Sequence, residues 1–365
     1  MINVTRPDLP PIEEYIEYLK GIWENRWLTN HGPLVRLLER RARDYLQVKN
    51  LVVVANGTLA LQIALRALEL KGEVITTPFT FATTTNVLMW EGLTPVFADI
   101  DPRTFNIDPV HVEKKISEKT SAILATHLYG NPCHVEMLAQ IARKHDLKLI
   151  YDAAHAFGVE YKNQSVLDYG DVSTLSFHAT KVFTTGEGGA IVFKDERLLE
   201  KIRLLINHGI ASEERVIIPG INAKMNEFQA ALGLCGFEHI YEKIRSRKRL
   251  YEFYKERLAG TNIQFQKIIA SRYNYSYMPI GLENLHHRDM VYSELLRNGI
   301  KPRKYFFPLT VQFDYLNKKG KDLVGHYDLK HAADIANRIL CLPLYTDLDV
   351  SVADDICKII KGKKM

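Results

Sequence analysis

The stretch LVVVANGTLALQIALRAL, residues 51–68, joins an apolar strand to a helix through Asn56, Gly57 and Thr58. We expect the strand over 51–55 and the helix over 58–70, closed by Gly72. Strands linked by helical crossovers predict a mostly parallel sheet with helices on both faces, whose sites lie at the carboxyl ends of the strands. The same alternation continues, with strands expected at 74–77, 96–98, 122–126 and 147–151 and helices near 82–91 and at 134–145.

The character of the chain changes near residue 240. Residues 241–258 have the composition of a charged helix, rich in Lys, Arg and Glu, and shorter mixed elements follow. A chain of 365 residues is long for one domain. We therefore expect an α/β protein with a large domain over 1–240 and a smaller α+β domain over 241–365.

Charge and hydropathy exclude several classes of protein. The net charge is +5, and no basic stripe with interleaved aromatic residues is present, so we expect no nucleic-acid binding. No segment approaches the roughly 18 uninterrupted apolar residues of a membrane helix, and the first residues lack a secretory signal pattern. The four cysteines have neither CxxC pairing nor zinc-ligand spacing. We expect reduced thiols, no metal, no membrane insertion and a cytoplasmic location.

The turn at Asn56-Gly57-Thr58 is a candidate phosphate site. Gly57 lets the backbone approach a ligand closely, and the helix start offers free N–H groups and the positive end of its dipole. An ordinary turn with a helix cap would have the same sequence, so the motif alone leaves both interpretations open.

Residues 149–155, LIYDAAH, bring Asp152 to the end of an apolar strand, with His155 close behind. A carboxylate there could hold a ring nitrogen protonated, as pyridoxal phosphate requires for its role as an electron sink. A strand-end Asp that caps the next turn, with His155 as a core histidine, is the alternative.

Lys181 lies between the strand-like run 173–177 and the glycine-rich turn 186–189. Its neighbours are apolar or small, so desolvation could lower its pKa and favour the neutral amine that a Schiff base requires. Ser176 could place its hydroxyl on a phosphate. The turn GEGG is not a P-loop, because it lacks the required spacing and lysine.

The three features follow one another in a characteristic order. Asp152 comes about 95 residues after Gly57, and Lys181 about 30 residues later, as expected of a fold-type I pyridoxal-phosphate enzyme. Over nearly its whole length the chain resembles the DegT/DnrJ/EryC1/StrS family of sugar aminotransferases. The matching stretches are NGTLAL (56–61), TPFTFAT (77–83), FADID (97–101), DAAH (152–155), SFHATK (176–181), GEGGA (186–190), NAKMNEFQAA (222–231) and LPL (342–344).

The resemblance implies an aspartate aminotransferase-like fold with pyridoxal 5'-phosphate bound at Lys181. As the catalytic residue, Lys181 would form an imine with the cofactor and then carry the proton between substrate carbon and cofactor. Asp152 would bind the pyridine nitrogen. Phe81 would stack on one face of the ring, although a core aromatic at this position is the alternative. His155 would lie near the ring hydroxyl or ring face, where many relatives carry glutamine.

The resemblance also implies how the cofactor phosphate is held. Gly57, Thr58 and Ser176 would bind it within one chain, and Asn222 would reach the phosphate of the neighbouring subunit. The usual family pattern at this point is Asn-Tyr-Arg-Met, whereas residues 222–225 here read NAKM. Asn222 is retained while its neighbours differ. A homodimer with shared active sites is therefore expected.

The reaction implied is transfer of an amino group from glutamate, released as 2-oxoglutarate, to a nucleotide-linked keto-sugar. Some relatives carry histidine in place of the lysine and act as dehydratases, so Lys181 favours transamination. Residues 2–5 and the loop 27–33 resemble enzymes that aminate C4 of dTDP-4-keto-6-deoxyglucose to give dTDP-4-amino-4,6-dideoxyglucose. We expect this reaction, with amination of C3 of a dTDP-3-keto-6-deoxyhexose as the close alternative.

Two further kinds of protein are compatible with the same motifs. A pyridoxal-phosphate lyase or dehydratase, or a non-catalytic regulator, could share the same fold. Arg303, Lys304 and Tyr305 are candidates for contacts to the nucleotide diphosphate or the sugar, although an ordinary solvated basic loop would have the same composition.

Overall fold

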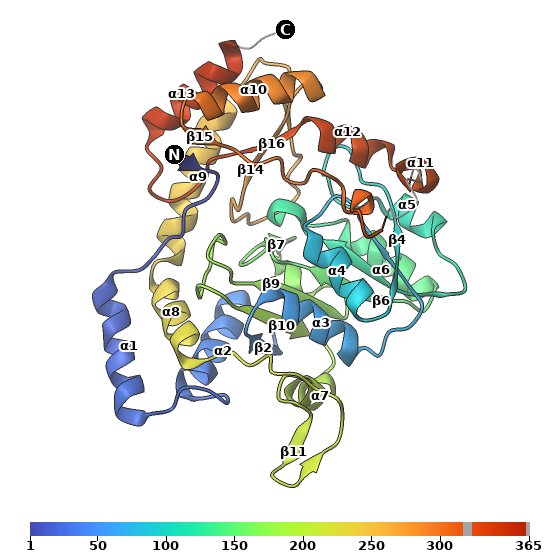
Figure 1. Cartoon of the computed structure of the whole chain (residues 1–365), viewed down its shortest axis with the longest axis vertical. Helices are drawn as coiled ribbons and strands as arrows, with labels where there is room; N and C mark the ends of the chain where they lie inside the picture. Colours follow the sequence, from blue (N-terminus) through green and yellow to red (C-terminus); the bar gives the residue numbers. More distant parts are fainter. Residues whose placement is uncertain (317–322, 363–365) are drawn as a thin grey trace.

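The computed structural model describes residues 1–316 and 323–362. Its centre is a seven-stranded sheet with the strand order β2-β10-β9-β6-β5-β3-β4 (Figure 1). Strand β10 is antiparallel to both of its neighbours, and the other pairs are parallel. The strands are β2 (Leu51–Val54), β3 (Glu73–Thr76), β4 (Thr94–Phe97), β5 (Thr120–Thr126), β6 (Lys148–Asp152), β9 (Val172–Ser176) and β10 (Gly189–Phe193).

Helices cover both faces of this sheet. Successive strand residues point to opposite sides, and because they are apolar on both sides, each face must be buried. Val53 packs into a cluster with α2 and α6, whereas Val52 and Val54 pack with α3 and α7. The helices of this part are α2 (Pro33–Leu46), α3 (Gly57–Ala67), α4 (Ala82–Trp90), α5 (Pro109–Lys114), α6 (Val135–Lys144), α7 (Leu198–Leu205) and α8 (Glu227–Glu238), with α1 (Ile12–Asn25) packed on α8.

The predicted α/β architecture is confirmed, with small shifts at the ends of elements. Helix α3 ends at Ala67, earlier than the expected residue 70, and Glu69 has a left-handed φ of 54° that ends the helical path. The antiparallel direction of β10 was not foreseen. Only the loop 177–188, without a crossover helix, joins it to β9, so the chain must return in the opposite direction.

The C-terminal part has its own antiparallel sheet, β13-β14-β16, and its own apolar cluster. Strand β1 (Ile2–Asn3), at the start of the chain, pairs with β15 (Ile300–Lys301) of this part. The division at residue 240 stays a prediction. The elements here are β13 (Gln264–Phe265), β14 (Met278–Gly281), β16 (Ile339–Leu342), α9 (Ile240–Arg257), α10 (Leu285–Arg297), α11 (Leu323–Tyr327), α12 (Lys330–Arg338) and α13 (Val350–Gly362).

Two short hairpins complete the fold. Strands β7 (Glu160–Tyr161) and β8 (Gln164–Ser165) form one, and β11 (Ile210–Ser212) and β12 (Arg215–Val216) form the other. The second hairpin projects from the body of the molecule below α7 (Figure 1). No helix in the described part of the chain is long and apolar enough to cross a membrane.

Helix α2 is capped from a distant point of the sequence. Its N-cap residue, Gly32, has no side chain to accept a hydrogen bond. The buried carboxylate of Glu227, in the first turn of α8, accepts the N–H groups of Leu34 at 2.8 Å and Val35 at 3.0 Å. These bonds satisfy helix-start donors that would otherwise be buried without partners.

We expect Glu227→Gln to lower the free energy of unfolding by about 1–3 kcal/mol, because the amide offers one acceptor oxygen where the carboxylate offers two. Chemical denaturation measures this loss. The control is Glu238→Gln at the end of the same helix, where the carboxylate forms an exposed ion pair with Arg41; we expect a change of under about 1 kcal/mol there. Equal effects of the two substitutions would contradict the capping role.

Candidate active site

A cavity of about 370 Å³ opens at the carboxyl ends of the strands. It brings together residues that are far apart in the sequence, from the turn after β2 to residues that follow β9. All but one of the cofactor-binding residues predicted from the sequence line it, namely Gly57, Thr58, Phe81, Asp152, His155, Ser176 and Lys181. The exception is Asn222.

Lys181 reaches this cavity from the loop between β9 and β10. Its backbone N–H donates to the carbonyl of His178 at 2.9 Å, which fixes the local turn. Burial lowers the pKa of its amine from 10.5 to about 8, against the opposing attraction of Asp152. The amine is therefore neutral in a substantial fraction of molecules near pH 8, as nucleophilic attack on an aldehyde requires.

Asp152 is the last residue of β6, and its carboxylate is almost fully buried. One oxygen accepts the N–H of Ala154 at 3.1 Å, and the other accepts the hydroxyl of Thr84 at 2.8 Å. Burial raises the pKa of Asp152, whereas these two bonds and the charge of Lys181 act to lower it. A buried carboxylate of this kind is suited to a cationic partner inside the cavity.

His155 forms part of an aromatic wall. Its Nδ1 accepts the backbone N–H of Tyr129 at 3.1 Å, so the neutral ring carries its proton on Nε2. Burial, with a smaller contribution from the charge of Lys181, holds the pKa of His155 well below its usual value. The ring is parallel to that of Phe306 at 6.1 Å and meets Tyr277 edge-on at 4.9 Å. His155 is therefore a neutral, fixed N–H donor in an apolar wall.

The end of β9 and the start of α3 approach each other closely at Gly57. A Cβ added to Gly57 would lie 2.8 Å from Cβ of Ser176, so only glycine permits this approach. The Asn56 side chain caps α3 by accepting the N–H of Leu59 at 2.9 Å. The helix start and the Ser176 hydroxyl thus face one cavity, which is the arrangement that an anionic phosphate favours.

Phe81 directly precedes α4 and keeps about half of its surface exposed (53%) while lining the cavity. The core-aromatic alternative is therefore wrong for this residue. Its ring meets Phe306 edge-on at 6.3 Å. The exposed part of the Phe81 side chain is therefore available for stacking with a flat ligand that enters the cavity.

Sequence reasoning missed most of the aromatic wall. Tyr277 and Phe306 line the cavity from the C-terminal part, and Tyr277 Oη lies 3.5 Å from Lys181 Nζ. Tyr305, already a candidate, also lines the cavity. Lys304 instead pairs with Asp289 at 2.5 Å, and the guanidinium of Arg303 lies over the Tyr305 ring at 4.8 Å. Isolated aromatic residues carry no local pattern that could have revealed Tyr277 or Phe306.

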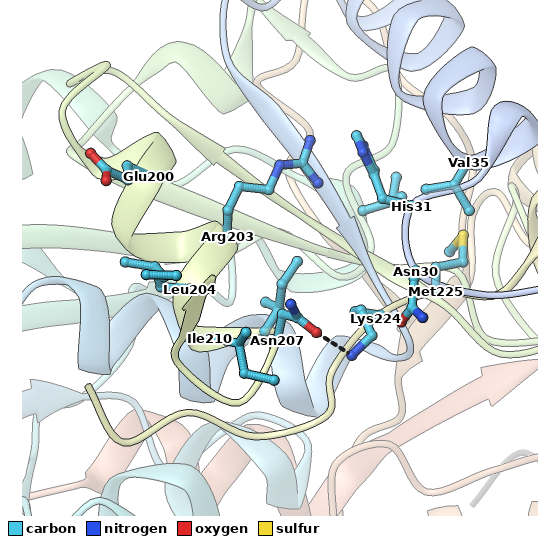
Figure 2. Close-up of a pocket in the computed structure, with 13 residues that line it drawn as sticks. Asn30, His31, Val35, Glu200, Arg203, Leu204, Asn207, Ile210, Lys224 and Met225 are labelled. Atoms are coloured by element: carbon cyan, nitrogen blue, oxygen red, sulfur yellow. Dashed lines mark hydrogen bonds between the residues drawn. The ribbon is translucent and has the colours of Figure 1, made fainter. Parts of the chain in front are cut away.

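Asn222 is exposed, and its backbone bridges to that of Asn207. A second cavity of about 340 Å³ lies beside this segment. Figure 2 shows Lys224 in this cavity, bonded to the Asn207 side chain at 2.7 Å. Arg203 and His31, also in Figure 2, both bond to the buried carboxylate of Glu39. None of the site residues predicted from the sequence lines this second cavity in the described part of the chain.

Residues 1–316 and 323–362 contain no candidate metal-binding site. No group of three or more His, Cys, Asp or Glu side chains there could hold an ion. All four cysteines are free and buried.

Comparisons with known proteins find relatives of similar sequence and structure. The chain is 45% identical to a dTDP-4-amino-4,6-dideoxy-D-glucose transaminase of Shigella dysenteriae, over 100% of this chain and 99% of the relative. Its structure matches DesI, solved in the presence of its TDP-sugar product, with a TM-score of 0.92 and 34% identity over 99% of this chain and 92% of that one. It also matches the PLP form of the sugar aminotransferase Spr1654 of Streptococcus pneumoniae, with a TM-score of 0.90 and 28% identity over 99% of each chain.

The family resemblance predicted from the sequence is confirmed by a match to the family model over residues 11–361. That match spans both the sheet that carries Lys181 and the C-terminal part that supplies the aromatic wall. The chain therefore belongs to the DegT/DnrJ/EryC1/StrS aminotransferase family.

Proposed function

We propose that this chain transfers an amino group from glutamate to C4 of dTDP-4-keto-6-deoxyglucose, giving dTDP-4-amino-4,6-dideoxyglucose, with pyridoxal 5'-phosphate as cofactor. The observation that carries the proposal is the shared cavity of Lys181 and Asp152, a nucleophilic amine and a buried carboxylate. The choice of sugar and of carbon rests on the name of the relative with 45% identity.

The residues present fit this cofactor. The start of α3 at Gly57 lies close to the Ser176 hydroxyl, and together they suit the cofactor's phosphate. The buried Asp152 carboxylate suits a protonated ring nitrogen. Phe81 is half exposed and could stack on the ring, and the Nε2–H of His155 is a donor for the ring hydroxyl. When bound, pyridoxal phosphate supplies an electron sink for the carbon that exchanges its amino group.

Each side chain then has a distinct task in our proposal. Lys181 Nζ would hold the cofactor, and its amine would carry a proton to or from the reacting carbon. The negative charge of Asp152 would favour the protonated, cationic form of the cofactor's ring nitrogen. The wall of His155, Tyr277 and Phe306 keeps bulk water away from the reacting carbon, which favours transfer of the amine over hydrolysis.

We further propose a homodimer in which Asn222 contacts the cofactor phosphate of the other subunit. The exposure of Asn222 and its position outside the cavity of its own chain support this. The free, buried state of all four cysteines suits a reducing compartment, and we place the reaction in the cytoplasm.

Lys181→Ala is expected to abolish the yellow colour of the purified protein and to lower the transamination rate by roughly a thousandfold or more. Borohydride reduction of the wild type followed by peptide mass spectrometry should find the cofactor on Lys181. Lys304→Ala is the matched control, because Lys304 pairs with Asp289 outside the cavity; it should keep the colour. A reduced cofactor attached to another lysine would refute the assignment.

The reverse reaction tests the sugar and the carbon. With 2-oxoglutarate present, we expect dTDP-4-amino-4,6-dideoxyglucose to be consumed and glutamate to accumulate, as followed by chromatography. Consumption of the 3-amino isomer instead would establish the C3 alternative. Incubation with glutamate alone separates transamination from lyase, dehydratase or regulatory roles, because only an aminotransferase should release 2-oxoglutarate.

Mixing two inactive variants tests the role of Asn222. If Asn222 acts on the other subunit, a mixed dimer of Lys181→Ala and Asn222→Ala chains keeps one intact site. Random reassociation should then restore about a quarter of wild-type activity, since half of the dimers are mixed and each has one working site. An absence of recovery, with mixed dimers verified by mass spectrometry, would contradict a contact across the interface.

A further inference from the structure

A row of three buried threonine hydroxyls ends on the carboxylate of Asp152. Thr84 Oγ1 lies 2.8 Å from Asp152 Oδ2, Thr80 Oγ1 lies 2.9 Å from Thr84 Oγ1, and Thr126 Oγ1 lies 3.1 Å from Thr80 Oγ1. All three side chains are at most 3% exposed. They come from three segments: the loop after β3, the first turn of α4 and the end of β5.

The direction of these hydrogen bonds follows from the ionised carboxylate. A carboxylate can only accept, so Thr84 must donate its single hydroxyl proton to Asp152. The Thr84 oxygen is then left to accept from Thr80, and the Thr80 oxygen to accept from Thr126. Each donation makes the next hydroxyl a stronger donor, so the row as a whole favours negative charge on Asp152.

Thr84 does not line the cavity itself but bonds to two residues that do, Asp152 and Thr80. Thr80 and Thr126 line the cavity, whereas Thr84 lies behind the carboxylate and is not among the described lining residues. The second oxygen of Asp152 is held by the N–H of Ala154, so the two bonds together fix the plane of the carboxylate.

We propose that Thr84 is a positioning residue that holds Asp152 oriented and ionised toward the ring nitrogen of the cofactor, with Thr80 and Thr126 strengthening its hydrogen bond. This inference rests on the proposed function, because it assigns a task to Asp152 that only a cationic ring partner would require. It adds a residue that neither the motifs nor the cavity lining indicate.

The electrostatic surroundings support this role. Burial opposes the charge of Asp152 and raises its pKa, and the Thr84 bond is the largest influence that lowers it, followed by the Ala154 N–H and the charge of Lys181. Two further ionisable side chains close by are neutral: the buried thiol of Cys133, whose pKa is raised, and the ring of His155, whose pKa is lowered. Removing the Thr84 hydroxyl therefore raises the pKa of Asp152 further, and the carboxylate is lost at a higher pH.

Thr84→Val tests the proposal, because valine keeps the shape and removes the hydroxyl. Pyridoxal phosphate is titrated into cofactor-free protein between pH 5 and pH 8, and its affinity is measured from the absorbance change. We expect roughly ten- to a hundredfold weaker binding at neutral pH, the range for a lost hydrogen bond to a charged group. The acid-side midpoint of binding should move up by about one pH unit or more. The phosphate of the cofactor titrates equally in all variants, so the difference reports on Asp152.

The chain offers a matched control in the next residue. Thr85 is equally buried, and its hydroxyl bonds to Thr310 Oγ1 at 2.9 Å, away from Asp152. Thr85→Val should therefore leave the affinity and its pH dependence near those of the wild type, whereas Thr84→Ser should restore both. In turnover, Thr84→Val should lower kcat with little change in KM for the sugar nucleotide.

The outcomes separate this inference from the proposed function. If the wild type binds pyridoxal phosphate and the two variants Thr84→Val and Thr85→Val show the same affinity and pH dependence, the role of Thr84 is overturned. The aminotransferase assignment then still stands. A wild-type protein that takes up no pyridoxal phosphate would overturn both. Thermal unfolding of each cofactor-free variant shows whether a loss of affinity comes from a loss of folded protein. The proposal is supported if Thr84→Val is as stable as Thr85→Val but binds the cofactor more weakly.

Discussion

Burial acts in opposite directions on Lys181 and Asp152, lowering the pKa of the amine and raising that of the carboxylate. Each group would be costly to hold in the interior alone, and the attraction between them offsets part of that cost. Because this offset is only partial, the neutral amine becomes available as a nucleophile, and the buried carboxylate favours a cationic partner. These two properties make the cavity reactive. The sheet, the aromatic wall and the hydroxyl row can each be understood as a means of keeping this pair buried and correctly oriented.

The sheet brings the pair together through the order of its strands. Strands β6 and β9 are parallel neighbours, so Asp152 and Ser176 end at the same edge. The antiparallel return of β10 makes the connecting loop fold back over this edge, and the loop carries Lys181 above the end of β6. The start of α3 joins them through β2, which pairs with the other side of β10. Helices cover both faces of the sheet, and the cavity opens at this edge.

The C-terminal part completes the cavity from the other side. Tyr277 and Phe306 place apolar rings around His155 and beside Lys181. Their contribution is to lower the local polarity, which strengthens every charge interaction inside the cavity. The position of this part relative to the large sheet therefore influences both the exposure of the amine and the space left for a sugar nucleotide.

The sequence by itself determined the α/β class, most of the strand and helix order and the family, and it singled out Gly57, Asp152, Ser176 and Lys181 as candidates that the fold brings to one cavity. This was possible because each of these residues belongs to a local pattern, a strand that ends in a turn, and because the ends of parallel strands meet at one edge. Tertiary structure alone decided the partners of these residues. Thr84 lies 68 residues from Asp152, and Tyr277 lies 96 residues from Lys181. Such contacts depend on strand order and on how two parts of the chain pack, and neither leaves a periodic signal in the sequence. The contact predicted for Asn222 depends on a second copy of the chain, so it stays a prediction.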